Sequence, residues 1–581
     1  MANFRTPFHK FLPVLNWLPG YRREWLSSDL NAGITVGIML IPQGMAYAMI
    51  AGLPPVYGLY AALIPQVIYA LTGTSRKLGY GPVAMDSLLV AAGLGALKLS
   101  GIDEYIGMAI FLALFMGIIQ ITLGLLRLGF LVRFLSKPVI SGFTSAAALI
   151  IGFSQLKHLL GTEISSSNQF HLMMYNAGIK LGHTHLPTLG LGLVAIVLIL
   201  VLKRINKKIP GALIAVILSI IASNLLNLEA KGVPLVGQIP EGLPAFGVPV
   251  VPWDKLGDLF SIALALALIA FMEAISVAQA IEEKDKTDEL RPNQELIALG
   301  LSNVIGSFFQ SYPTTGGFSR TAVNQEIGAR SGLNLIISAL VIALTLLFLT
   351  DLFYQLPNAI LAAIIMVAVS GLIDLRYPKI LYKKRKDEFV LLIITFLLTL
   401  FIGIREGILL GVLFSLLLLV HRTSRPHIAV LGKIKGSPYF RNLKRFEKEA
   451  ETTPGLLIFR FDGQLYFGNR DYFKKQLARL IEINPTPVQT VILNAESMNY
   501  IDSSAVYTLR QVLDDFDQRG ITLLIAGAIG PTRDILHKSG LIHQLGKECV
   551  FSSTLDAYEY ALNKKTPSPL QQKISLQSKE L

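Results

Sequence analysis

SYPTTGGFSRTAVN, residues 311–324, is a polar interruption between two strongly apolar segments of the chain. Its proline and paired glycines disfavour a continuous helix, and a new helix can begin at Phe318. At membrane depth, that helix start would offer free backbone N–H groups, the positive end of the helix dipole and Arg320, which together suit an oxyanion. Irregular backbone survives at that depth only where it lines a cavity or is buried in protein. The stretch therefore predicts a membrane protein that binds an anion.

The composition agrees with a membrane setting. Of the 581 residues, 52% are hydrophobic and only 16% are charged, which leaves room for a large membrane domain and one soluble domain. The net charge of +13 does not predict nucleic-acid binding, because the cations fall largely between apolar segments, as the positive-inside rule expects. Cys549 is the only cysteine, which excludes an intramolecular disulfide and a cysteine-based metal site. The N-terminal segment 1–25 lacks a cleaved-signal pattern and is expected to be cytoplasmic.

Apolar segments long enough to cross a membrane recur along residues 26–422. Two shorter segments that begin at Gly/Pro breaks bring the expected number of crossings to fourteen. An even number returns the chain to its starting side, and the cation clusters between segments put both termini in the cytoplasm. The segments are expected at about 31–50, 57–73, 82–97, 104–126, 138–156, 186–202, 210–227, 259–280, 294–310, 317–330, 333–351, 357–374, 388–403 and 406–420.

The chain also contains a weak internal repeat. In each set of seven crossings the third is short and broken, at GYGPVAMDS (residues 79–87) in the first half and at residues 311–324 in the second. Because seven is odd, the two halves run in opposite directions through the membrane. Matching breaks in inverted halves predict a midplane binding site between facing half-helix N-termini.

The stretch PQGMAYAMIAGLPPVYGLYAALIPQVIYALTGTSRKLGYGPVA, residues 42–84, resembles the SulP sulfate permease family, relatives of the animal multifunctional anion exchangers. The resemblance runs from about residue 20 to 562. It implies an α-helical membrane protein with a 7+7 inverted repeat of fourteen transmembrane segments. These segments divide into a core (crossings 1–4 and 8–11) and a gate (crossings 5–7 and 12–14). The resemblance also implies a C-terminal cytoplasmic α/β STAS domain and a homodimer.

The same resemblance implies an anion pocket shared by three crossings. An amide and an aromatic ring come from the first crossing, and backbone N–H groups come from the starts of the third and tenth. The cation in the tenth supplies a positive field. The implied substrate-binding residues are Gln43, Tyr47, Val83, Ala84, Phe318, Ser319 and Arg320.

Glu273 lies in the middle of a long apolar run, LALIAFMEAISVAQ (residues 266–279). A carboxylate there is costly unless it is protonated, paired or facing a cavity, so a functional role is the default. The resemblance associates this position with coupling to H⁺ or Na⁺. A proton suits a glutamate, whereas a sodium ion would need further oxygen ligands, for which Thr314 and Thr315 are candidates. An ion pair with Arg320 is an alternative that is compatible with coupling.

Asp86 departs from the apolar residue that the family pattern leads us to expect near the start of the third crossing. An acid there favours the helix dipole but opposes a nearby anion. Asp86 is therefore a possible second acidic site, a partner for a cation, or a capping or packing residue.

Residues 423–453 are predicted to form a polar, basic connector that contains one strand-like run, and residues 454–563 a small α/β domain. NYIDSSAVYTLRQVL resembles the STAS signature, with Asp502 and Ser503 at a helix start. Asp502 is expected to cap that helix, and Ser503 is a possible site of regulatory phosphorylation. The tail 564–581 is predicted to be disordered.

The sequence contains no enzymatic constellation, ATPase module or P-loop spacing, so no enzyme activity, organic cofactor or metal is expected. The leading hypothesis is sulfate uptake by H⁺ symport with an elevator-like mechanism, in a bacterial inner membrane. The alternatives are a Na⁺-coupled bicarbonate symporter, an anion exchanger, and a membrane-anchored STAS signalling scaffold with a cytoplasmic partner.

Overall fold

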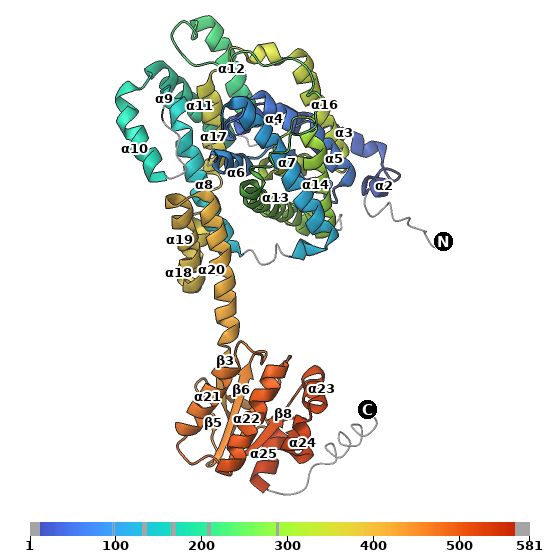
Figure 1. The fold of residues 1–581 in the computed structure, drawn as a ribbon, viewed down its shortest axis with the longest axis vertical. Helices are drawn as coiled ribbons and strands as arrows, with labels where there is room; N and C mark the ends of the chain where they lie inside the picture. The colour runs from blue at the N-terminus through green and yellow to red at the C-terminus, as the bar shows by residue number, and fades with distance from the viewer. Residues whose placement is uncertain are drawn as a thin grey trace. The chain divides into compact units, whose positions relative to one another are not determined.

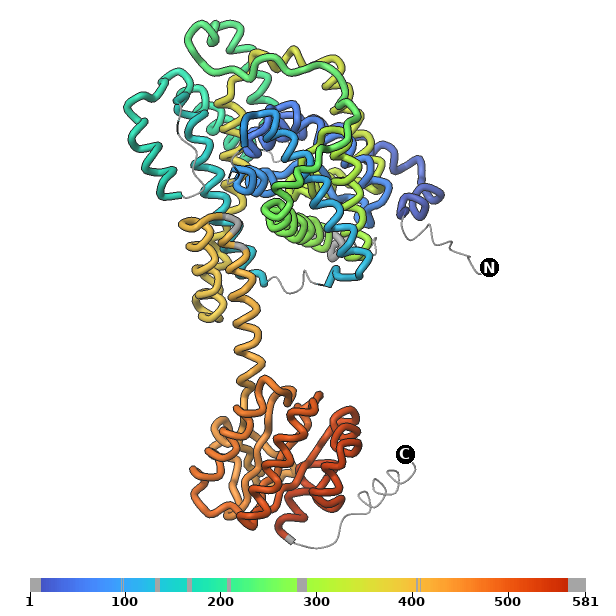
Figure 2. Tube along the Cα trace, viewed as in Figure 1, coloured from blue at the N-terminus to red at the C-terminus, as the bar shows by residue number. Residues whose placement is uncertain are grey.

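The computed structural model describes residues 12–95, 97, 99–130, 136–162, 164, 170–205, 211–285 and 290–563. The chain divides into two compact units, Met1–Ser415 and Leu416–Leu581 (Figures 1 and 2). The boundary falls a few residues before the predicted end of the membrane domain at residue 422. The predicted tail 564–581 and residues 1–11 of the predicted N-terminal segment lie outside the described residues.

The first half of the membrane unit contains the elements expected for seven crossings, several of them divided into two helices. The elements are α2 (Val14–Trp17), α3 (Arg23–Ile50), α4 (Val56–Ala61), α5 (Ile64–Thr72), β1 (Tyr80–Gly81), α6 (Ala84–Gly95), α7 (Ile102–Leu125), α8 (Lys137–Ser154), α9 (Leu156–Leu160), α10 (Phe170–Lys180), η2 (Leu181–His183), α11 (Leu186–Ile205) and α12 (Gly211–Leu226).

The second half repeats this order, with another two-residue strand and short helix in third place. Its elements are α13 (Leu256–Asp285), α14 (Pro292–Ser307), β2 (Thr315–Gly316), α15 (Phe318–Ile327), α16 (Leu333–Phe348), η3 (Thr350–Phe353), α17 (Asn358–Ser370), α18 (Arg376–Lys384), α19 (Lys386–Phe401) and α20 (Ile404–Ser424).

Five helices in the described part of the chain are by length and composition able to cross a membrane on their own: α3, α7, the α8–α9 pair, α11 and the first part of α13. The remaining crossings of the fourteen-span inverted repeat use shorter apolar helices or helices broken at Gly and Pro. A core and a gate are visible in the contacts. In the core, α7 packs on α14 and α3 packs on α16, whereas in the gate α8 packs on α19 and α11 packs on α17 (Figure 1).

Glycines allow the core helices to approach closely. A Cβ on Gly117 of α7 would lie 2.7 Å from the carbonyl oxygen of Gly300 in α14, and a Cβ on Gly300 would lie 2.6 Å from that of Gly117. Small residues at such crossings drive helix association in membranes, where the hydrophobic effect between helices is weak.

The C-terminal unit contains a mixed sheet whose strand order is β4-β3-β6-β7-β8-β9. β6, β7, β8 and β9 are parallel, and β3 pairs antiparallel with β6. Its elements are β3 (His427–Ile434), β4 (Phe440–Asn442), β5 (Ala450–Glu451), β6 (Leu456–Asp462), α21 (Arg470–Glu482), β7 (Thr490–Asn494), α22 (Ser503–Arg519), β8 (Thr522–Ala526), α23 (Gly530–Lys538), α24 (Leu541–Leu545), η4 (Lys547–Cys549), β9 (Val550–Phe551) and α25 (Thr554–Asn563).

The structure moves one predicted boundary. The predicted connector 423–453 supplies β3, β4 and β5, and β3 hydrogen-bonds to β6 along four residue pairs. The α/β domain therefore begins near His427 rather than at residue 454. The short apolar run in HIAVLGKI predicts a strand, but its sheet partner depends on register, which the pattern does not contain.

Candidate functional site

The two predicted breaks meet. β1 and β2 form a two-residue antiparallel bridge in which Tyr80 faces Gly316 and Gly81 faces Thr315. Gly81 has a φ of 141°, a conformation that favours glycine. A Cβ on Gly316 would lie 2.7 Å from the side chain of Leu78, so the bridge is also too tight for a larger residue. The two matching breaks of the internal repeat therefore pair directly with each other.

The bridge positions two helix starts. α6 begins at Ala84 and α15 begins at Phe318, each two or three residues after its strand. Because the strands are antiparallel, the chains leave the bridge in opposite directions, with both helix N-termini next to it. Backbone N–H groups in a first turn have no intrahelical acceptor, and the dipole makes this end positive. The geometry thus concentrates positive potential from both halves at one place.

Arg320 adds a full charge at this place. Its side chain is 1% exposed, and Nη1 donates a hydrogen bond to the carbonyl oxygen of Pro82, at 2.9 Å. Nε and Nη2 have no hydrogen-bond partner among the described residues. Gly317 approaches the guanidinium so closely that a Cβ there would lie 2.7 Å from Nη2. Arg320, from the second half of the repeat, is thereby held against Pro82 in the break of the first half. Its Nε and Nη2 groups remain available to donate hydrogen bonds to a ligand.

α3 supplies the predicted amide and aromatic ring. Gln43 and Tyr47 are both buried, at 9% and 5% exposure, and Oε1 of Gln43 has no partner among the described residues. Tyr47 interacts electrostatically with Arg320 and Glu273. α3 contacts both α6 and α15, and Tyr47 interacts with Arg320 in the first turn of α15.

The helix starts differ in exposure. Val83 and Ala84 are buried, whereas Phe318 is 51% exposed and Ser319 is also exposed. Further along α15, Ala322 and Glu326 continue the same exposed face, three to four residues apart. The start of α15 is therefore exposed, whereas the start of α6 is buried.

Glu273 on α13 faces this group. It interacts electrostatically with Arg320, but its Oε2 has no hydrogen-bond partner among the described residues. The hydroxyl of Thr315 donates to the carbonyl oxygen of Ala270, 2.7 Å away, which ties β2 to α13 one turn before Glu273. Glu273 is thus held near Arg320 with one unpaired oxygen.

Thr314 belongs to a polar network that the sequence pattern did not predict. Its backbone N–H donates to Oδ1 of Asn303, at 2.9 Å, and its carbonyl oxygen accepts from Asn303 Nδ2 and the Tyr80 hydroxyl, at 3.0 and 3.1 Å. The Thr314 hydroxyl is also within hydrogen-bond distance of Tyr80 and Asn303. Asn303 is fully buried, and an asparagine within a membrane segment is the feature of the sequence that could have indicated this network.

Asp86 lies in the first turn of α6 and is fully buried. Neither carboxylate oxygen has a hydrogen-bond partner among the described residues, so the side chain does not cap the helix. It interacts electrostatically with Glu273. The structure therefore brings Asp86 and Glu273 close enough to interact.

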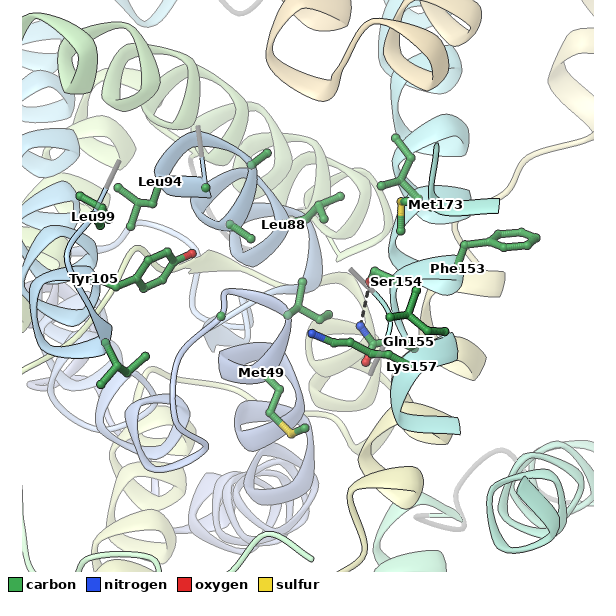
Figure 3. Close-up of a pocket in the computed structure, with 18 of the residues that line it drawn as sticks. Met49, Leu88, Leu94, Leu99, Tyr105, Phe153, Ser154, Gln155, Lys157 and Met173 are labelled. Carbon is green, nitrogen blue, oxygen red and sulfur yellow. Dashed lines mark hydrogen bonds between the residues drawn. The ribbon is translucent and has the colours of Figure 1, made fainter. Parts of the chain in front are cut away.

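A cavity of about 630 Å³ borders the other side of α6 (Figure 3). Leu88 and Leu94 of α6 line it from the core, and Phe153 and Lys157 line it from the gate. Lys157 is the only charged residue among the described residues that line this cavity. Lys157 is not distinguished in the sequence, because a lysine at the end of a crossing is usually a topological signal.

In the C-terminal unit, Asp502 caps α22 as predicted. Its side chain accepts hydrogen bonds from the backbone N–H groups of Ala505 and Phe467, both at 2.8 Å. Ser503 is exposed at the start of the helix. The cap thus joins α22 to the loop after β6, and the serine hydroxyl is accessible to solvent.

Comparisons with known proteins agree with this architecture. A sequence model of the sulfate permease family matches residues 26–395, and one of the STAS domain matches residues 447–557. "Sulfate transporter 4.1, chloroplastic" of Arabidopsis thaliana is 38% identical, over 97% of this chain and 84% of that protein. A probable sulfate transporter of Mycobacterium tuberculosis is 33% identical, over 92% of this chain and 96% of that protein.

Solved structures show the same fold. Murine solute carrier 26 family member A9, an anion transporter in the inward-facing state, aligns with a TM-score of 0.88 and 26% identity, over 97% of this chain and 96% of that chain. The transmembrane domain of a cyanobacterium bicarbonate transporter aligns with a TM-score of 0.60 and 24% identity, over 68% of this chain and 98% of that one. The second likeness concerns the fold alone.

Proposed function

This chain belongs to the sulfate permease family, and from that premise we propose that it is a secondary active transporter that takes up sulfate together with protons. Its multi-pass membrane domain and STAS domain are those of an anion-transport family. The identity of the substrate, the coupling ion and the transport cycle are what we propose beyond family membership. No organic cofactor or metal takes part in the proposed cycle.

One observation carries the anion site. α6 and α15 begin at a shared bridge, and Arg320 lies buried between the breaks with Nε and Nη2 unpartnered among the described residues. A sulfate ion has four acceptor oxygens, so it can satisfy these donors and the free backbone N–H groups at once. Gln43 and Tyr47 close the pocket from α3, and the backbone N–H groups of Val83, Ala84, Phe318 and Ser319 are the proposed ligands.

Glu273 is the proposed coupling residue. A carboxylate near a buried arginine is the group whose charge state changes most readily when an anion enters or leaves. A sodium site would need several oxygen ligands. The hydroxyls of the candidates Thr314 and Thr315 already donate hydrogen bonds to protein acceptors, so both side chains have a role without a sodium ion, and we favour the proton.

We further propose an elevator-like movement of the core against the gate. The exposed face of α15 supports a route from the site toward one side of the membrane. The cavity between α6 and the gate supports a route from the other side. Movement of the core would connect the same site to each route in turn.

We also propose a membrane location, an oligomeric state and a regulatory site. The cation distribution favours cytoplasmic termini, and we propose the bacterial inner membrane and a homodimer. The exposed Ser503 is a proposed phosphorylation site, through which the STAS domain would meet a cytoplasmic partner.

The test is sulfate uptake into proteoliposomes under pH and Na⁺ gradients that are imposed separately. We expect accumulation with an inward proton gradient alone. Uptake driven only by Na⁺ would contradict proton symport, and bicarbonate uptake without competition by sulfate would contradict the substrate. Sulfate–sulfate exchange that neither gradient converts into accumulation would identify an exchanger, and no transport at all would favour the signalling scaffold.

A further inference from the structure

Buried acids in the membrane unit are of two kinds. Asp29 is fully buried, and it accepts hydrogen bonds from the Ser331 backbone N–H and hydroxyl, at 3.2 and 2.6 Å. Glu295, at 1% exposure, accepts from the Tyr69 hydroxyl at 2.7 Å and from the Thr74 backbone N–H at 2.5 Å. Such acids are fully engaged in holding helices together.

Asp86 is of the other kind. It is as deeply buried as Asp29, yet neither oxygen accepts a hydrogen bond among the described residues. The ionisable groups that interact with it electrostatically are Glu273 from α13, Tyr80 from β1 and Tyr312 from the segment before β2. Arg320 and Tyr47, which come from α15 and α3, interact with Glu273 in turn.

Neither tyrosine supplies Asp86 with a proton. The Tyr80 hydroxyl donates to the carbonyl oxygen of Thr314, and the Tyr312 hydroxyl is hydrogen-bonded to Ser87 at 3.1 Å. A bare carboxylate in such a place is costly, so native proteins protonate it or neutralise it. Asp86 therefore needs a ligand that the protein itself does not provide.

We propose that this ligand is a proton and that Asp86 is a second proton-binding group of the transport cycle. Each sulfate would then enter with two protons, one on Glu273 and one on Asp86. Both O–H bonds form on the outer side and break on the inner side, and no other covalent bond changes. The inference rests on the proposed proton-coupled sulfate transport and specifies its stoichiometry.

Charge balance supports two protons. With both acids protonated, Arg320 and a bound sulfate dianion give the loaded site a net charge of −1. With both acids ionised and no sulfate, the empty site also has a net charge of −1. Because the two states carry the same charge, neither half of the cycle moves net charge across the membrane. If Glu273 alone took up a proton, the two states would differ by one charge.

The shared positive field links the two binding events. When sulfate leaves, Arg320 becomes available to neutralise Glu273, and the N-terminus of α6 becomes available to Asp86, which lies in its first turn. When sulfate occupies these donors, the carboxylates lose that compensation and bind protons more tightly. Sulfate and proton binding therefore favour each other, as symport requires.

The experiment measures steady-state sulfate accumulation in proteoliposomes at clamped membrane potential. Each proton that is coupled contributes roughly tenfold accumulation per pH unit. The wild type should therefore reach about a hundredfold per unit, and Asp86→Asn about tenfold. An inside-negative potential of about 100 mV should leave the wild type unchanged and lower accumulation by Asp86→Asn roughly 50-fold, since that variant moves one net negative charge.

Glu295→Gln is the matched control, because it neutralises a buried acid that is already hydrogen-bonded. It should keep the hundredfold value even where the amount of folded protein falls. Sulfate–sulfate exchange reports whether Asp86→Asn is folded and binds substrate. If Asp86→Asn does not exchange sulfate, the number of protons that enter with each sulfate in the wild type decides whether a second proton-binding group exists.

The outcomes separate the two proposals. A wild type with no proton-driven accumulation contradicts the proposed function. A proton-coupled wild type whose ratio is one, or an active Asp86→Asn that keeps about a hundredfold per pH unit, overturns the role of Asp86 alone. A wild-type ratio of two that becomes one in Asp86→Asn supports it.

Discussion

Replacing Arg320 by alanine should weaken sulfate binding by about two orders of magnitude. The guanidinium has five N–H donors. Only Nη1 donates to a protein acceptor, the carbonyl oxygen of Pro82, and the three N–H groups on Nε and Nη2 have no partner among the described residues. A hydrogen bond to a charged group contributes about 1.5–3 kcal/mol. Two such bonds to one sulfate contribute at least about 3 kcal/mol, a factor of roughly 150 in Kd.

The assay is equilibrium binding of radiolabelled sulfate to the purified full-length protein, which separates affinity from transport. Arg320→Lys keeps the charge but loses the planar fork, so it should bind about tenfold more weakly than the wild type. Arg330→Ala is the control, because Arg330 is exposed beyond the end of α15 and its loss should change Kd by about twofold or less. An Arg320→Ala protein that folds and keeps its Kd within threefold would refute a direct role for the guanidinium.

Four further predictions concern other parts of the molecule. Gly58→Ala should destabilise the membrane domain by about 3 kcal/mol and lower its Tm, because the new Cβ would lie 1.9 Å from the Gly44 carbonyl oxygen; an unchanged Tm would contradict this packing. Asp502→Ala should cost about 1 kcal/mol and speed hydrogen exchange in the first turn of α22, whereas Asp502→Asn should keep that turn protected and lose only the bond from the Phe467 N–H. Burial, and then the neighbouring acid, raise the pKa of the Cys549 thiol to about 11, so maleimide should label the native protein slowly at pH 7.5 and the denatured protein fully; rapid native labelling would show an exposed thiol. Lys157→Gln should slow uptake of external sulfate by roughly tenfold at low ionic strength and by less in high salt, whereas an effect that is independent of salt would contradict electrostatic attraction by this cation.

The sequence is sufficient to predict the breaks and their pairing. Glycine and proline inside apolar segments have few physical explanations in a membrane, and their repetition at matching positions favours an inverted repeat. The bridge between Tyr80 and Gly316 realises that expectation. The sequence points to Arg320 because it lies in the first turn of the new helix, where its charge adds to free N–H groups and the positive dipole end.

The partners of each side chain could not be predicted in the same way. Thr314 has oxygen atoms that suit a cation. Asn303, eleven residues earlier on α14, already hydrogen-bonds to the backbone N–H and carbonyl oxygen of Thr314. Asp86 and Glu295 look alike as acids within apolar segments. Only the three-dimensional contacts distinguish the unpartnered carboxylate from the hydrogen-bonded one. Such distinctions depend on helix rotation and register.

The most direct test of the anion site is an experimental structure with bound selenate, a sulfate analogue whose anomalous scattering locates it unambiguously. The anion should lie between the N-termini of α6 and α15, within hydrogen-bond distance of Arg320 Nε or Nη2. Selenate that competes with sulfate for transport but binds elsewhere in the membrane domain would contradict the central claim that the two paired breaks form the substrate site.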